Sequence, residues 1–490
     1  MDKKVIVVGG GIGGLAASAL LAKEGFDVTV VEKNSTVGGR ARIWEKDGFR
    51  FDMGPSWYLM PEVFEHFFAL FGKKREDYYS LKRLDPAYRV FFEPGNGVDV
   101  FSNMEKASAL FESFEIGGAE KLRRYVEQSQ YKYEVAMQGF LYKNYTSVFD
   151  FFNRRMLIEG SRLNVFGSLD RIVGRQFKDR RAKQLLEYAM VFLGTSPQKA
   201  PGLYSIMSHV DLNLGVFYPH GGLSAVAGSL WQLAESLGVT IRTGEPVERI
   251  VVSEGRARGV VTANETLSAD LVVANADYAH VETRLLDDKA RSKSASYWDR
   301  RVWAPSMFLL YLGLNRRLPK LTHHNLYFSE NWNEHFDTIF KRPGWPQKPC
   351  FYISCISKSD DNAAPAGGEN VFVLVPVAPG LQDTDEQRQS YADHLISHVE
   401  EVSGESIRSA VAVQRVYSQR DFINDYNAYR GTALGLSHTL RQTAVFRPPL
   451  QSRRVKNLYY TGQYTHPGVG VPMVLISAQV AAGLIKEIVA

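Results

Sequence analysis

The chain has 490 residues, enough for a large core and more than one domain. Hydrophobic residues make up 45% and charged residues 23%, which excludes wholesale disorder. The net charge of +5, spread over this length, is too small to indicate nucleic acid binding.

The first element is an uncharged stretch, residues 5–22, that directly follows two lysines. By length alone it could be a membrane helix or a secretion signal. Its five glycines argue against both, because each glycine weakens a helix by about 0.8–1.0 kcal/mol relative to alanine. The stretch divides better into a β-branched strand over residues 5–8, a glycine turn over 9–14 and a helix over 15–23.

The glycine turn fits the G-x-G-x-x-G pattern at Gly9, Gly11 and Gly14. The first glycine permits the turn, the second lets the backbone approach a pyrophosphate, and the third lets the helix pack on the strand. A second strand, residues 27–31, ends at Glu32, where a carboxylate can accept hydrogen bonds from a ribose. The alternative is a glycine-rich turn without a ligand. The succession of a strand, a glycine turn, a helix and a second strand that ends at Glu32 favours a dinucleotide site.

A second glycine motif, K-N-S-T-V-G-G-R-A-R, follows Glu32 directly. It resembles the flavoprotein superfamily of amine oxidases and carotenoid desaturases, in which such a motif continues the cradle around FAD. Gly39 would allow close backbone approach and Arg40 would offset the pyrophosphate charge. The alternative for Arg40 is a solvated basic loop. The next motif, F-D-M-G-P-S-W over residues 51–57, predicts by itself only a turn.

The rest of the chain is expected to alternate between two domains. Residues 73–214 are aromatic and basic without a glycine fingerprint, and residues 302–445 mix strand-like and helical segments. Between them, short β-runs and a helix return the chain to the nucleotide fold. The expected fold class is α/β, with a discontinuous Rossmann-like cofactor domain and a mixed α+β substrate domain that carries a helical, membrane-facing part. The cofactor domain comprises residues 1–72, 215–300 and 446–490, and the substrate domain comprises residues 73–214 and 301–445.

The C-terminal segment begins as a strand over residues 457–461, passes through a Gly/Pro loop and ends in an apolar helix from about Met473. A helix N-terminus facing the pyrimidine end of a flavin can stabilise the anionic reduced ring. The alternative is an ordinary strand–loop–helix.

Four motifs, in order along the chain, resemble the bacterial phytoene desaturase family of carotenoid desaturases. They are V-V-G-G-G-I-G-G-L-A-A near the start, F-Y-P-H-G-G at 217–222, A-N-A-D at 274–277 and T-G-Q-Y-T-H-P-G-V-G-V-P-M at 461–473. The resemblance implies FAD as the redox cofactor, with Val247 contacting the adenine through its backbone. The residues it implies for FAD binding are Gly9, Gly11, Gly14, Glu32, Lys33, Gly39, Arg40, Gly54, Pro55, Ser56, Val247, Asp277, Gly462, Val471, Pro472 and Met473.

The implied reaction is insertion of C=C bonds into a long apolar polyene by hydride transfer to flavin N5, with oxygen or a quinone as electron acceptor. The implied location is cytoplasmic, at the inner face of the cell membrane. Departures from the family pattern at Gln463, Tyr464, His220 and Phe149 favour a late-pathway substrate. Such a reaction would be, for example, 3,4-desaturation of a hydroxylated or monocyclic carotenoid. Phytoene is the alternative substrate.

Asp150 and His220 are the candidate catalytic residues, with His466 as a further histidine candidate. The alternative for Asp150 is a helix N-cap. No metal site is expected, because the two cysteines, Cys350 and Cys355, form no C-x-x-C pattern and no cluster with histidine.

No second uncharged run of about 18 residues is expected, so no membrane span is predicted. The candidate membrane dock is residues 125–162, rich in aromatic and basic residues; a helix packed on the core with extended cations is the alternative. Rival functions are a carotenoid isomerase or ketolase, a flavin amine oxidase, and a non-enzymatic prenyl-binding chaperone of the GDP-dissociation-inhibitor type.

Overall fold

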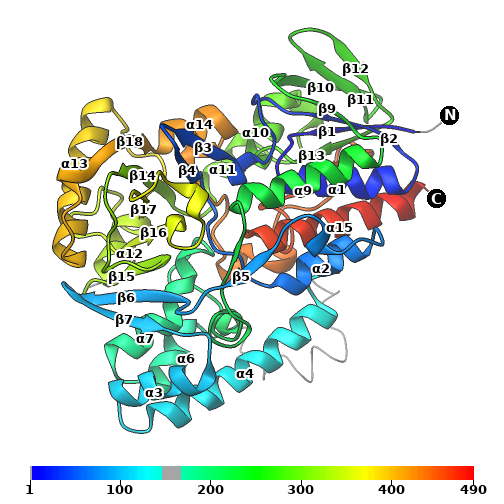
Figure 1. Ribbon diagram of the computed structural model, residues 1–490. Helices are drawn as coiled ribbons and strands as arrows, with labels where there is room; N and C mark the ends of the chain where they lie inside the picture. Colours follow the sequence, from blue (N-terminus) through cyan, green and yellow to red (C-terminus); the bar gives the residue numbers. More distant parts are fainter. Residues whose placement is uncertain (1–2, 146–166, 331, 490) are drawn as a thin grey trace.

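The computed structural model describes residues 3–145, 167–330 and 332–489. Two domains lie side by side, and the beginning and the end of the chain belong to the same one (Figure 1). The α/β fold class predicted from the sequence is confirmed.

The cofactor domain is built on a five-stranded sheet in the order β19-β13-β1-β2-β9, in which all neighbours are parallel. Its strands come from all three segments assigned to this domain from the sequence. They are β1 (Lys4–Val8), β2 (Asp27–Val31), β9 (Thr240–Arg242), β13 (Leu271–Ala274) and β19 (Leu458–Tyr460).

Both faces of this sheet are covered, which explains the continuous apolar run of β1. Val5 and Val7 pack among helices α1 (Ile12–Lys23), α2 (Pro61–Ala69), α9 (Leu223–Ser236) and α15 (Val471–Val489). Ile6 and Val8 face the antiparallel sheet of β10 (Val247–Ser253), β11 (Arg256–Thr262) and β12 (Thr266–Ser268).

The substrate domain is built on a seven-stranded sheet in the order β18-β14-β17-β16-β15-β6-β7. All its neighbours are antiparallel except β15 and β6. The strands are β6 (Tyr88–Glu93), β7 (Asn96–Val100), β14 (Ser306–Leu314), β15 (His324–Tyr327), β16 (Phe351–Ser354), β17 (Glu369–Val377) and β18 (Val411–Tyr417). Residues 73–214 are therefore not only helical, because they supply β6 and the edge strand β7.

Alternate side chains of β14 enter two different cores. Phe308 and Leu310 pack on the α13 side (Asp385–Ser403), whereas Met307 and Leu309 face the helical layer. That layer contains α3 (Met104–Phe114), α4 (Gly118–Gly139), α6 (Leu169–Gln176) and α7 (Arg180–Glu187), and it lies beneath the sheet in Figure 1.

The remaining strands and α-helices of the described chain are short. They are the hairpin β3 (Ile43–Lys46) and β4 (Phe49–Asp52), the pair β5 (Leu81–Arg83) and β8 (Phe217–Pro219), and the helices α8 (Ile206–His209), α10 (Tyr278–His280), α11 (Ala295–Asp299), α12 (Trp332–Phe340) and α14 (Gln419–Tyr426).

Two helices begin earlier than the sequence predicted. α1 begins at Ile12, inside the glycine run, because Gly11 is its N-cap and Gly13 and Gly14 form its first turn. α15 begins at Val471, since Pro472 is compatible with a first helical turn.

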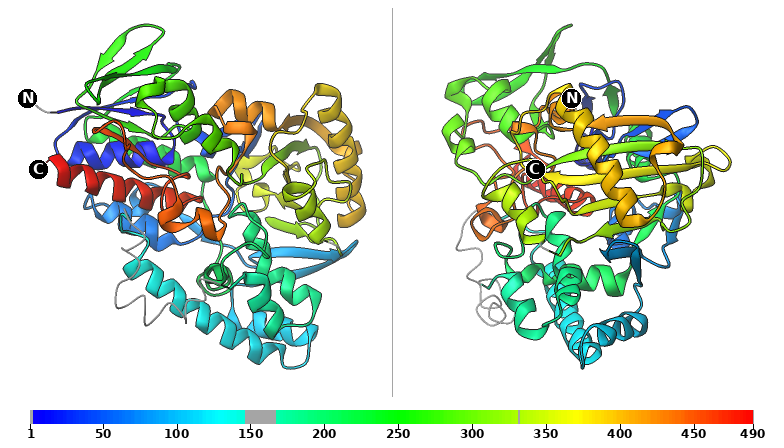
Figure 2. Two further views of the ribbon diagram at one scale, coloured as in Figure 1. Left: turned by 180° about the vertical axis from the view of Figure 1, so that it is seen from behind. Right: turned by 90° about the vertical axis from the view of Figure 1, so that its left-hand side faces the viewer.

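Within the described residues, α15 is long and apolar enough to cross a membrane over Val471–Ile488. The prediction of no second uncharged run was wrong, because residues 467–485 also carry no charged side chain. In the structure, Ile476, Ala481 and Ile485 of this helix are fully buried in the core that it shares with α1. The two helices run side by side in both Figure 1 and Figure 2.

Candidate functional site

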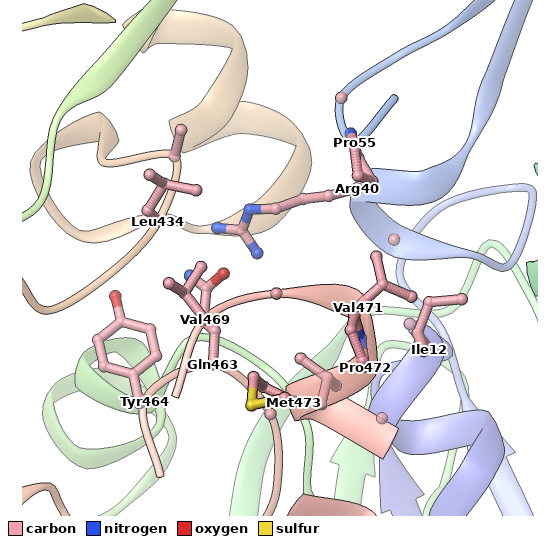
Figure 3. A pocket seen from close by; sticks show the side chains of 18 of the residues that line it. Ile12, Arg40, Pro55, Leu434, Gln463, Tyr464, Val469, Val471, Pro472 and Met473 are labelled. Carbon is pink, nitrogen blue, oxygen red and sulfur yellow. The ribbon is translucent and has the colours of Figure 1, made fainter. Parts of the chain in front are cut away.

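A cavity of about 540 Å³ lies at the junction of the two domains. This volume is within the range of small-molecule sites. One end is formed by the glycine turns and by the N-termini of α1 and α15, and the other by apolar side chains of both domains. Figure 3 shows the region around Arg40 and the start of α15. We call these two ends the cradle and the chamber. A smaller cavity of about 50 Å³ extends the chamber and shares Phe192 and Tyr352 with it.

The first glycine turn has the close packing that its spacing predicts. Gly9 has φ +100°, a conformation that favours glycine. A Cβ on Gly14 would lie 2.0 Å from the carbonyl oxygen of Gly9, so only glycine lets the helix approach the strand. Gly11 is similarly close to Gly39, where a Cβ would lie 3.1 Å from the Gly11 Cα. The two glycine motifs therefore meet in one backbone surface.

Asn275, in the A-N-A-D motif, joins the two ends of the chain. Its Nδ2 donates a hydrogen bond of 3.2 Å to the Gly9 carbonyl. A Cβ on Gly462 would lie 3.2 Å from Asn275 Oδ1. A Cβ on Gly13 of α1 would lie 2.7 Å from Val474 Cγ1 of α15. The N-termini of α1 and α15 thus reach the same cavity, and helix N-termini favour negative charge.

Glu32 is held in place at the end of β2. Its Oε2 accepts a hydrogen bond of 2.7 Å from the Gly10 amide, and its Oε1 accepts bonds of 2.8 Å from the Asn34 backbone and side chain. Oε2, which accepts a single bond, keeps acceptor capacity for a ribose hydroxyl. Lys33 also borders the cavity, but its Nζ donates to the Asn424 carbonyl and to Asn427 Oδ1. Lys33 therefore ties the cradle to the end of α14.

The surroundings of the Arg40 side chain show whether this site fits a diphosphate. Its guanidinium projects into the cavity and stacks 4.9 Å from the centre of the Tyr426 ring (Figure 3). Nε and Nη2 are buried without any hydrogen-bond partner. Leaving a buried guanidinium unpaired is costly, so an anionic ligand is expected beside it. The residues of the cradle therefore fit FAD.

The loop that carries Gly54, Pro55 and Ser56 lines the cavity beside Arg40. A Cβ on Gly54 would lie 2.7 Å from the Arg40 carbonyl, so the two loops are in contact. The Ser56 hydroxyl lies 2.8 Å from the hydroxyl of Tyr352, on strand β16 of the other domain.

The remaining residues assigned to the cofactor also line the cavity: Val247, Asp277, Gly462, Val471, Pro472 and Met473. Tyr464 donates a hydrogen bond to the Asp277 carboxylate, and the His280 amide donates a second one. Burial raises the pKa of Asp277, whereas these hydrogen bonds lower it. Figure 3 shows Val471, Pro472 and Met473 grouped at the start of α15.

The candidate catalytic residues have different positions. Asp150 lies outside the described residues. The His220 side chain is 56% exposed, lies 3.8 Å from an Asp360 oxygen and is not part of the cavity lining. The structure does not bring His220 to the site, because the turn after β8 faces solvent.

His466 does line the cavity. Its Nε2 lies 3.1 Å and 3.2 Å from the carbonyls of Phe140 and Leu141, so this nitrogen is the donor, and Nδ1 is buried without a partner. Burial lowers the pKa of His466 to about 4, which keeps the ring neutral near pH 7.

Sequence reasoning missed Arg447 and Lys132. Arg447 is buried and donates hydrogen bonds to the carbonyls of Gln463, Tyr464 and Thr465, so it holds the loop before α15. Burial lowers its pKa to about 10. Lys132 of α4 is buried in the chamber lining. Neither residue lies in a motif, so no local signal pointed to them.

Comparison with known proteins agrees with this geometry. The model of the flavin-containing amine oxidoreductase family matches residues 12–486. The chain belongs to this family. FAD is therefore its cofactor, consistent with the unpaired Arg40 and the paired glycine turns.

A carotenoid 3,4-desaturase from Haloarcula japonica is 46% identical over 99% of this chain and 98% of its own length. A zeta-carotene-forming phytoene desaturase from Myxococcus xanthus is 36% identical over 97% of this chain and 92% of its own. Among solved structures, an oxidoreductase from Methanosarcina mazei aligns with a TM-score of 0.64 and 16% identity, covering 99% of this chain and 100% of that one. The last similarity shows the fold alone.

Proposed function

We propose that this protein is an FAD-dependent carotenoid desaturase, and that its reaction is 3,4-desaturation of a late-pathway carotenoid rather than of phytoene. The identity to the Haloarcula japonica protein, which extends over nearly all of both chains, supports the choice of 3,4-desaturation. The observation that carries the proposal is an apolar chamber that adjoins the FAD cradle in one continuous cavity.

The chamber suits a hydrocarbon because both domains contribute aliphatic and aromatic walls. Its lining includes Leu59 and Met60 from the cofactor domain, and Val191, Phe192, Leu309 and Leu374 from the substrate domain. Burying a polyene here gains about 25 cal/mol for each Å² of apolar surface removed from water. The same walls exclude water from the reacting carbons.

The chamber does not suit an amine. The acids of the described lining are Glu32, Asp277 and Asp425, and each carboxylate already has a protein partner. Asp425, for example, pairs with Arg42. Lys132 adds a cation that repels an ammonium group. This argument favours the desaturase over the amine oxidase alternative.

FAD, when bound, supplies the hydride acceptor. Arg40 and the N-termini of α1 and α15 stabilise the negative charge of such a cofactor. His466 is the proton acceptor that we propose among the described residues, because its Nε2 is held by backbone carbonyls and Nδ1 is free to accept. A weak base is sufficient, since a cation delocalised along a polyene loses its proton readily. Asp150 stays a sequence prediction.

Oxygen or a quinone is the electron acceptor that we propose, because the sequence contains no second dinucleotide fingerprint. We also propose that the enzyme acts at the inner face of the cell membrane, since a carotenoid substrate resides in lipid and has little solubility in water.

The test is expression in a colourless host that makes one precursor carotenoid at a time. A desaturase lengthens the chromophore and removes two hydrogens for each new double bond. Absorption and mass spectra together separate this result from an isomerase, which leaves the mass unchanged, and from a ketolase, which adds oxygen. Unchanged pigments with every precursor, or a purified protein without flavin absorbance, would contradict the proposal.

A further inference from the structure

One corner of the surface borders the cavity and carries exposed apolar side chains. In the segment 439–446, Thr443 and Ala444 line the cavity and are half-buried. Leu440 and Phe446, near the two ends of the same segment, are 37% and 50% exposed. The cavity wall and the exposed side chains therefore belong to one short stretch of chain.

Val302 belongs to the same corner. Its amide donates a hydrogen bond of 2.9 Å to Gln442 Oε1, and Gln442 Nε2 donates one of 2.7 Å to the Val302 carbonyl. Val302 is 38% exposed. Three of the eight exposed large apolar side chains among the described residues thus lie together beside the cavity. We call Val302, Leu440 and Phe446 the apolar lip.

A cluster of cations flanks the apolar lip. Arg301 and Lys293 lie 4.4 Å and 4.5 Å from the centre of the Tyr297 ring. Burial lowers the pKa of Lys293, and repulsion from Arg453 and Arg301 lowers it further, whereas the nearby Glu282 carboxylate acts in the opposite direction. The three cations are therefore close together. Across the described part of the chain, none of the three forms an ion pair with a carboxylate. Three cations held together near a single buried carboxylate, Glu282, leave a net positive charge, which favours an anionic partner.

We propose that the apolar lip and the cation cluster dock the protein on an anionic lipid bilayer. The lip inserts between the headgroups, and Lys293, Arg301 and Arg453 contact the lipid phosphates. Docking here places the Thr443–Ala444 side of the cavity against the membrane. The proposal rests on the proposed function for the reason to dock, because a hydrocarbon substrate then passes from lipid to chamber without crossing water.

This surface differs from the dock expected from the sequence at residues 125–162. In the described part of that segment, α4 buries Tyr125, Val126, Tyr133 and Ala136 against the core. Tyr131 is the one large apolar side chain of α4 that is exposed, at 36%. A surface with several exposed apolar side chains and unpaired cations has the composition that lies on membranes.

The test is flotation of the FAD-loaded protein with vesicles, which needs no enzymatic turnover. Vesicles of phosphatidylcholine alone are compared with vesicles that contain equal parts of phosphatidylcholine and phosphatidylglycerol, at low and high salt. One double variant, Leu440→Ser with Phe446→Ser, removes the lip, and another, Arg301→Gln with Arg453→Gln, removes two charges. The matched control, Ile116→Ser with Trp231→Ser, removes two exposed apolar side chains elsewhere (95% and 41% exposed).

We expect wild type to bind the anionic vesicles and to dissociate at high salt. The charge variant loses about fivefold in affinity for each cation. The lip variant loses about tenfold or more, and the control binds like wild type. Flavin content, melting temperature and turnover in detergent micelles stay unchanged in all variants, so failure of this proposal is separable from failure of the proposed function.

Several outcomes would overturn the proposal: no binding by wild type, equal binding to neutral and anionic vesicles, or lip and control variants that behave alike. Loss of binding in Tyr131→Ser, with normal binding by the lip variant, would assign docking to α4. A change in oligomeric state of the lip variant, with vesicle binding intact, would assign the lip to contact between two copies of the chain.

Discussion

Replacing Lys132 by methionine removes a buried positive charge from the wall of the chamber. Lys132 is 2% exposed, and its Nζ donates a hydrogen bond of 2.9 Å to Ser205 Oγ. No carboxylate pairs with it among the described residues. Burial lowers the pKa of Lys132 from 10.5 to about 8. At pH 7 the folded protein therefore keeps a charge in an apolar wall.

The pKa difference gives the size and the sign of the effect. Each pKa unit corresponds to about 1.4 kcal/mol, so the charged Lys132 costs about 3–4 kcal/mol of unfolding free energy at pH 7. Between pH 8 and 10.5 the unfolded chain holds this proton and the folded chain does not. Stability contributed by this site therefore rises with pH across that window. Methionine is similar in length, carries no charge and removes the cost.

We expect Lys132→Met to melt at a higher temperature than wild type at pH 7. The advantage should shrink between pH 8 and 10.5, where the wild-type amine becomes neutral in the folded state. Thermal unfolding of the FAD-loaded protein, followed by tryptophan fluorescence at a series of pH values, measures this difference. Lys456→Met, at an exposed position, is the control and should follow wild type at every pH. A lower melting temperature for Lys132→Met at pH 7, or an advantage that does not depend on pH, would refute the reasoning.

Four further substitutions test the cradle and the segments around it. Gly14→Ala places a methyl group 2.0 Å from the Gly9 carbonyl and should abolish flavin retention, which flavin absorbance measures. In the control Gly228→Ala, the new Cβ meets no atom within 4 Å, so this change should stabilise α9 by about 0.5–1 kcal/mol, which the melting temperature measures. Arg40→Met removes the unpaired guanidinium and should weaken FAD affinity by roughly 10- to 100-fold in a flavin fluorescence titration; unchanged affinity would mean that Arg40 does not face the diphosphate. Arg447→Met leaves the carbonyls of the preceding loop without donors and should destabilise the protein by about 3 kcal/mol; equal melting temperatures would contradict the role assigned to it.

The motif residues were predictable because their chemistry is local. The spacing of Gly9, Gly11 and Gly14 specifies a strand–turn–helix by itself, and Glu32 follows at the end of the next strand. Backbone geometry over a few residues determines these contacts. Gly9, Gly11 and Glu32 line the cavity, whereas Gly14 packs against the Gly9 carbonyl and does not line it. The α/β fold class was correct for the same reason, whereas the FAD cofactor, also correct, was predicted from the resemblance of the motifs to a flavoprotein family. The start of α1 at Ile12 was missed because Gly13 and Gly14 have low helix propensity, which tertiary packing overrides.

Residues without a local pattern could not be predicted in this way. Arg447 and Lys132 are single charged side chains in ordinary segments, and only the packing of distant elements buries them. The same holds for the cation cluster, in which Lys293 and Arg301 meet Arg453 from a segment about 150 residues later. His220 illustrates the opposite case, since its motif resembles one from the family but its side chain is exposed.

The amino-acid sequence by itself determined the α/β class, the glycine cradle and the acid at the end of β2, because short-range backbone sterics dictate them, and its resemblance to a flavoprotein family indicated FAD. Tertiary structure alone decided which side chains are buried without partners, which wall of the chamber carries a charge and where apolar side chains stay exposed. The physical reason is that burial and charge proximity depend on residues far apart in the chain, and no local pattern encodes the neighbours that folding brings together.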